Sequence, residues 1–211
     1  MRNSAGKPVL MKMATAIQEN KDYLGEVDGL IGDGDHGMNM NKGFSMFADQ
    51  IIKSDIGFAE GLYELGNVLF SKIGGSMGPI YGTVFMGMAE AGKDFDVIDL
   101  DRFSAMLSAG LRELRDVVQA QVGDKTLIDT LEPAVVAVEN AAKEGKSFAD
   151  ALREMKTAAQ AGRDSTKDLA AKFGRSSRLG ERSRGVLDAG AVSCCIILCA
   201  MADGILGYAG D

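Results

Sequence analysis

Three aspartates in a glycine-rich segment are the residues of this sequence whose spacing most clearly suggests chemistry. Asp28, Asp33 and Asp35 lie among glycines at positions 29, 32, 34 and 37, which let the backbone turn tightly enough to aim several carboxylates at one point. Converging carboxylates repel one another at neutral pH unless a cation neutralises them. Oxygen ligands without cysteine suit Mg²⁺ better than Zn²⁺. We therefore predict a magnesium site here, and an acidic, solvated turn is the alternative.

The residues that follow the aspartates could contribute to an anion site. His36 is the only histidine in the chain, which excludes any site built from several histidines, and its own role is equally open between structure and catalysis. Residues 37–39 begin a predicted helix, and residues 74–79 (GGSMGP) precede another. The N–H groups at a helix N-terminus can hold an anion. Ordinary turns between helices are the alternative for both segments.

A long polar segment near the C-terminus stands out from the other connections. Residues 172–190 read KFGRSSRLGERSRGVLDAG and are dense in glycine, serine and arginine. Polar loops of this length are uncommon between helices of a compact domain, so we expect this one to be functional or disordered. Its arginines, at positions 175, 178, 182 and 184, either balance phosphate charge or keep the loop solvated.

The elements that must position these segments are helices. Apolar residues recur every three or four positions, as in Phe58, Leu62 and Leu65, and no segment alternates with the period of a strand. Ser147 with Asp150, and Thr126 with Asp129, have the spacing of helix-starting capping boxes. Short connections favour an all-α, antiparallel up-and-down barrel or bundle of about eight amphipathic helices. We predict them at 8–24, 38–53, 57–73, 78–92, 99–121, 126–144, 147–171 and 188–208.

Length and charge bound the kind of protein. The 211 residues fit one domain, 1–211, and the net charge of −7 argues against nucleic acid or an anionic membrane as partner. The run Ala189–Ala202 carries no charge, which suits a helix buried on most sides, and its 14 residues are too few to cross a bilayer. The three cysteines within it are expected to be buried, reduced thiols, and the cytoplasm is the expected compartment.

Four segments, in order along the chain, resemble the signature motifs of the dihydroxyacetone kinase L subunit family. The first is Asp28-x4-Asp33-Gly34-Asp35-His36-Gly37-x-Asn39-Met40. The others are GGSMGPIYG from Gly74, GDKTLIDTLEPA from Gly123 and GRSSRLGERSRGVLDAGA from Gly174. They are spread along the chain, and the resemblance covers essentially the whole sequence. Departures from the family pattern fall in the expected nucleotide pocket and its cover, at Met77, Leu127, Arg178 and Ala189.

The resemblance implies an antiparallel eight-helix barrel that binds a nucleotide at one end. It implies that Asp28, Asp33 and Asp35 hold two Mg²⁺ ions, which bridge them to the phosphates of ADP or ATP. It also implies a set of residues that contact the nucleotide: His36, Gly37, Met38, Asn39, Ser76, Met77, Leu127, Arg175, Asp188, Ala189 and Gly190.

The implied activity is transfer of a phosphoryl group to dihydroxyacetone, or a related short ketose, held by a separate K subunit. The resemblance further implies that a phosphohistidine-carrying M subunit of the phosphotransferase system recharges the bound ADP. Three alternatives stay open. One is an ATP-exchanging L subunit for another ketose such as a tetrulose. The second is the related domain of fatty-acid kinases, where threonine is usual at the position of His36. The third is a non-catalytic helical module that binds a divalent ion.

Overall fold

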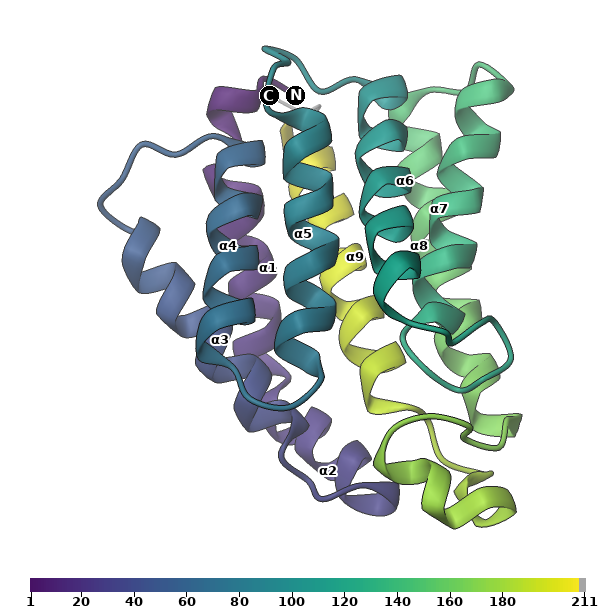
Figure 1. The fold of residues 1–211 in the computed structure, drawn as a ribbon. Coiled ribbons are helices and arrows are strands. Elements are labelled where there is room, and N and C mark those ends of the chain that lie inside the picture. The colour runs from purple at the N-terminus through teal and green to yellow at the C-terminus, as the bar shows by residue number, and fades with distance from the viewer. Residues whose placement is uncertain (209–211) are drawn as a thin grey trace.

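The computed structural model of the chain describes residues 1–208. Within that range the chain forms nine α-helices and three short 3-10 helices, and no strand (Figure 1). An isolated antiparallel bridge pairs Arg2 with Val97. The prediction of an all-α domain is confirmed. The last three residues of the predicted domain 1–211 lie outside the described residues.

The long helices stand side by side with short connections between most of them (Figure 1). Helices that follow one another in sequence pack together, as α4 does with α5 and α7 with α8, and α9 packs against both α1 and α8. The α-helices are α1 Lys7–Glu19, α2 Lys21–Ile31, α3 His36–Ile51, α4 Phe58–Lys72, α5 Met77–Gly92, α6 Leu100–Val117, α7 Ile128–Lys143, α8 Phe148–Ser165 and α9 Ala189–Tyr208. The 3-10 helices are η1 Asn3–Ala5, η2 Thr166–Asp168 and η3 Arg175–Ser183.

Helix α9 is the core helix of the bundle. It continues past the uncharged run to a length of 20 residues, so by length and composition it could cross a membrane. The prediction that this segment is too short to cross a bilayer was therefore wrong. Beyond the uncharged run the helix includes Asp203, whose carboxylate pairs with Lys156 of α8. Of its most apolar stretch, 67% is buried inside the domain, as expected for a helix that is apolar on all sides. Its three cysteines are free, and Cys194 and Cys195 are buried.

The first predicted helix, 8–24, is in fact two helices. Helix α1 ends at Glu19, and α2 runs from Lys21 to Ile31, so Asp28 lies in a helix rather than in a loop. Glycines at 25 and 29 lower helix propensity and made this segment look like a connection. Helix α3 nevertheless crosses α2 at very close range, and Gly37 is the residue that permits it. A Cβ on Gly37 would lie 1.9 Å from the Lys21 carbonyl oxygen and 2.7 Å from the Gly25 nitrogen.

Two other predicted helices end earlier than expected. The helix predicted at 99–121 ends at Val117, and the one at 147–171 ends at Ser165. In both places side chains offer the backbone partners other than a helix. The Asp124 carboxylate accepts the N–H of Gln121 at 2.8 Å. The Ser183 hydroxyl accepts the N–H of Ala171, also at 2.8 Å. The segment 172–190 is accordingly ordered, and residues 175–183 within it form η3.

Each predicted capping box forms one of its two reciprocal bonds. The Ser147 hydroxyl accepts the N–H of Asp150 at 3.0 Å and caps α8. The Asp129 carboxylate accepts the N–H of Thr126 at 2.7 Å, and the Thr126 hydroxyl accepts the N–H of Ile128 at 3.2 Å. The second box also shapes the turn that precedes α7.

The close crossing of α2 and α3 predicts a large cost for one added methyl group. Gly37→Ala should lower the free energy of unfolding by about 1–3 kcal/mol, because the backbone of Lys21 must move to admit it. Gly207→Ala on α9 is the matched control, since a Cβ there meets nothing within 4 Å. It should stabilise the protein by up to about 1 kcal/mol. Urea denaturation of both variants measures the difference, and equal stabilities would contradict the described crossing.

Candidate metal centre

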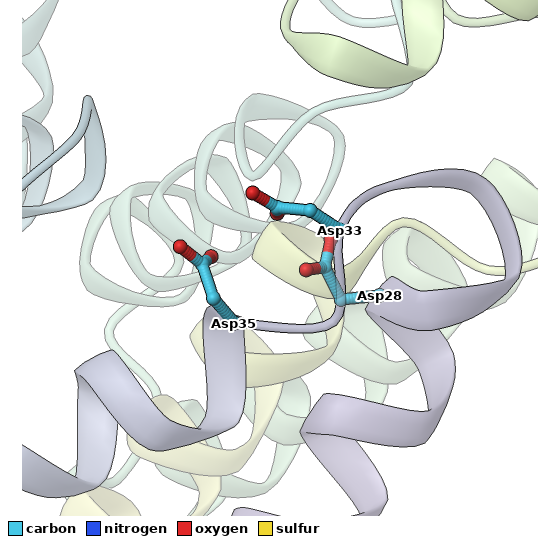
Figure 2. Close-up of side chains that lie close together, drawn as sticks. All are labelled: Asp28, Asp33 and Asp35. Carbon is cyan, nitrogen blue, oxygen red and sulfur yellow. The ribbon is translucent and has the colours of Figure 1, made fainter.

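The three predicted aspartates lie together at the junction of α2 and α3. Asp28 belongs to the last turn of α2, Asp33 to the connection, and Asp35 directly precedes α3. One carboxylate oxygen of each lies within 4.8 Å of the others. Figure 2 shows the three carboxylates turned toward a shared space beside the connection. Two oxygens on one octahedral Mg²⁺ lie roughly 3–4 Å apart, since each Mg–O bond is about 2.1 Å. Small side-chain rotations would therefore let this set hold a magnesium ion.

The local backbone keeps the three carboxylates on one side. Gly34 has a φ of +77°, a left-handed conformation that glycine adopts without strain, and it turns the chain between Asp33 and Asp35. The N–H of His36, at the start of α3, donates to Oδ2 of Asp28 at 3.3 Å. Asp28 is therefore tied to the N-terminus of α3, while the outer carboxylates remain accessible.

Negative charge dominates the cluster. Burial raises the pKa of Asp28, and the neighbouring charges of Asp33 and Asp35 raise it further, against the lowering effect of the His36 N–H. One cation is close, since Nη1 of Arg175 lies 2.8 Å from Oδ2 of Asp33. Exposed ion pairs of this kind contribute little to stability. A single arginine therefore leaves most of the repulsion in place, and a divalent cation would relieve it.

His36 faces the interior of the bundle. Its Nε2 lies 2.8 Å from the hydroxyl of Ser193 on α9, and its side chain is buried. Burial lowers its pKa to about 4, so the imidazole is neutral at neutral pH. The ring thus joins the start of α3 to α9.

Ser193 is the centre of a small polar network inside the core. Its hydroxyl also lies 2.7 Å from the hydroxyl of Tyr81, which donates to the carbonyl of Gly190 at 3.1 Å. Through this network α3, α5 and α9 are held together at the end of the bundle that carries the aspartates. Ser76 and Met77 begin α5 at the same end (Figure 1). The sequence reasoning missed Ser193 and Tyr81, and the available signal was a polar side chain within an apolar helix.

The third and fourth motifs meet beside this network. Asp188 caps α9, because its Oδ2 accepts the N–H of Ala191 at 2.8 Å. A Cβ on Gly190 would lie 3.5 Å from the nitrogen of Leu127, so the turn before α7 touches the start of α9. Burial raises the pKa of Asp188 to about 7, and the charges of Asp129 and Asp28 act in the same direction.

The remaining predicted residues lie in the first turn of α3 and in η3. Met38 is exposed in the first turn of α3, and Asn39 is partly buried beside it. Among the arginines of the predicted loop, Arg175 pairs with the aspartate cluster, whereas Arg184 pairs with Glu181 at 2.6 Å. The structure thus gathers the four motifs at one end of the bundle.

Comparisons with known proteins give a consistent result. The family model described as DAK2 domain matches residues 30–203, and its match begins just after Asp28. A protein of Listeria innocua named PEP-dependent dihydroxyacetone kinase 1, ADP-binding subunit DhaL, is 37% identical over 186 residues, which are 88% of each chain. The ADP-binding subunit DhaL of Escherichia coli K12 is 35% identical over 187 residues, 87% of this chain and 88% of that protein.

A solved structure shares the fold. It is the dihydroxyacetone kinase from C. freundii in complex with AMP-PNP and Mg²⁺, and it superimposes with a TM-score of 0.71 at 20% identity. The match covers 92% of this chain and 33% of that one, so this chain spans about a third of the length of that kinase.

The network around Ser193 makes a testable contribution to stability. Ser193→Ala should lower the free energy of unfolding by about 1–3 kcal/mol, because the buried Nε2 of His36 loses its partner. Ser71→Ala on α4 is a matched control, since that hydroxyl is exposed and bonds only within its own helix. The control should change stability by less than about 0.5 kcal/mol. Chemical denaturation checks both, and a neutral Ser193→Ala would contradict the network.

Proposed function

This chain belongs to the DAK2 domain family, together with the ADP-binding subunits of dihydroxyacetone kinases, and we propose that it performs their task. In this proposal it is the kinase subunit that holds a magnesium-bound nucleotide and passes its phosphoryl group to a short ketose. The observation that carries the proposal is the convergence of three carboxylates within 4.8 Å at the α2–α3 junction. Phosphoryl transfer depends mainly on positioning and charge neutralisation, which such a site supplies.

Charge arithmetic supports two ions rather than one. Three carboxylates and ADP together carry a charge of about −6, and two Mg²⁺ ions return +4. When bound, the ions would link Asp28, Asp33 and Asp35 to the diphosphate and neutralise charge as the phosphoryl group moves. Arg175, already paired with Asp33, is close enough to the cluster to turn toward an incoming phosphate.

The residues of this chain have separate tasks in the proposal. The first turns of α3 and α5 offer the backbone N–H groups of residues 37–38 and 76–77 to the diphosphate, and Asn39 offers its side chain. Leu127 and residues 188–190 line the other side of the proposed nucleotide site, where the turn before α7 touches the start of α9. His36, neutral and bonded to Ser193, fixes the start of α3 rather than accepting a proton.

The rest of the reaction is assigned to partners. A separate K subunit would hold the ketose, dihydroxyacetone or a related compound, and a phosphohistidine-carrying M subunit would recharge the bound ADP. The names of the relatives, which call them PEP-dependent, favour recharging over free exchange of ATP. The proposal places the protein in the cytoplasm. Exchange of ATP with a tetrulose as acceptor is the alternative.

Removing one carboxylate tests the metal site. Asp33→Asn should weaken ADP binding in the presence of Mg²⁺ by roughly tenfold or more, because an oxygen ligand loses its charge. Asp49→Asn is the matched control, an exposed aspartate in the last turn of α3. Titration calorimetry gives both affinities, and unchanged binding by Asp33→Asn would remove the metal assignment.

Thermal denaturation separates the kinase subunit from a module that only binds a divalent ion. After removal of ADP and metal with a chelator, Mg²⁺ with ADP at 100 times its dissociation constant should raise Tm by about 5–10 °C. Mg²⁺ alone should raise it much less, since the diphosphate supplies part of the coordination. A Tm that responds to Mg²⁺ or Ca²⁺ but not to ADP would favour the module.

A further inference from the structure

Lys125 is a buried lysine to which the proposed site gives no task. Its side chain is 1% exposed, and a buried ammonium is costly unless its hydrogens find acceptors. Its Nζ donates to the carbonyl oxygen of Thr166 at 2.5 Å and to that of Val186. Both partners are backbone carbonyls, so the ammonium fixes the position of two chain segments.

The backbone of Lys125 is held in an unfavourable conformation. Its φ is +62°, and within residues 1–208 it is the one residue other than glycine with a positive φ. Such a conformation costs about 1–2 kcal/mol and persists where the surroundings impose it. Here the Asp129 carboxylate imposes it, because its two oxygens accept the N–H groups of Gly123 and Thr126 at 2.6 and 2.7 Å. The strained turn aims the ammonium inward.

The two segments that Lys125 holds lead directly to the start of α9. Val186 lies two residues before Asp188, and the hydroxyl of Thr166 accepts the N–H of Asp188 at 3.0 Å. The N–H of Gly185 donates to the carbonyl of Lys167 at 2.7 Å. The connection from α8 to α9 is therefore pinned on both sides of the ammonium, and Asp188 is fixed as the cap of α9.

The contacts continue from α9 to the aspartate cluster. Ser193, in the first turns of α9, bonds to His36, and the N–H of His36 donates to Asp28. On the other side of the same turn, Leu127 lies against Gly190. The Lys125 ammonium thus holds segments that lead to the start of α9, and it bonds to none of the three aspartates.

We infer that Lys125 is a positioning residue for the nucleotide, whose ammonium holds the start of α9 and the turn before α7 at a set position relative to the aspartate cluster. The inference rests on the proposed function. Loss of the ammonium frees the α8–α9 connection to move, and loss of a residue that orients a metal site typically lowers its affinity by about 10–100-fold.

Lys125→Met tests this inference, because it keeps the length of the side chain and removes the ammonium. Calorimetry with ADP in excess Mg²⁺ should give a dissociation constant about tenfold higher than that of the wild type. Val9→Ala is the control for a purely structural effect. Val9 is fully buried on α1 and packs against Gly204, near the far end of α9. At a temperature where both variants are fully folded, Val9→Ala should bind ADP as the wild type does.

Thr166→Val provides a second test at the same junction if Lys125→Met fails to fold. It keeps the backbone carbonyl and removes the hydroxyl that accepts the N–H of Asp188. It should also weaken ADP binding, by about three- to tenfold. Binding within twofold of the wild type in either folded variant would overturn the inference. So would an equal loss in Val9→Ala. A wild-type chain that binds no ADP would overturn the proposed function, and the inference with it.

Discussion

This structure must hold three carboxylates close together although they repel one another. Asp28, Asp33 and Asp35 would separate in an unfolded chain, and in the folded protein one arginine offsets only part of their charge. The fold holds them together through backbone contacts, namely the close crossing of α2 and α3 and the bond from the N–H of His36 to Asp28. The fold therefore sustains an arrangement that a divalent cation would relieve.

The other contacts at this end of the bundle extend that arrangement inward. The backbone N–H of His36 bonds to Asp28, and its imidazole is linked through Ser193 to Tyr81 within an otherwise apolar core. Buried polar groups are costly when unpaired and confer a fixed geometry when they are satisfied. Among residues 1–208, no fully buried side-chain nitrogen or oxygen is left without a partner. Fixed geometry is what a site that works by positioning requires.

The sequence predicted the features that depend on local spacing and missed those that depend on packing. The convergence of the aspartates was predictable, because glycines surround them whether Asp28 lies in a loop or in a helix. Helix α2 was not, because Gly25 and Gly29 weaken a helix in isolation, and only the folded chain brings Gly37 of α3 against the backbone of this segment. Lys125 was also missed. A lysine between Asp124 and Thr126 looks solvated, and only the folded chain brings the carbonyls of residues 166 and 186 to its ammonium.

The helices and the connections of this bundle contribute different properties to the site. A bundle of apolar helices is rigid but offers few polar groups, whereas its connections offer many and are usually mobile. In this chain the connections at one end are held by buried charged groups, as Asp129 holds the turn before α7 and Lys125 holds the segment before α9. These groups are satisfied by backbone partners, so each holds its connection in place without needing a second charged side chain. The end that carries the aspartates can therefore be both polar and rigid, which neither the helices nor free loops would achieve alone.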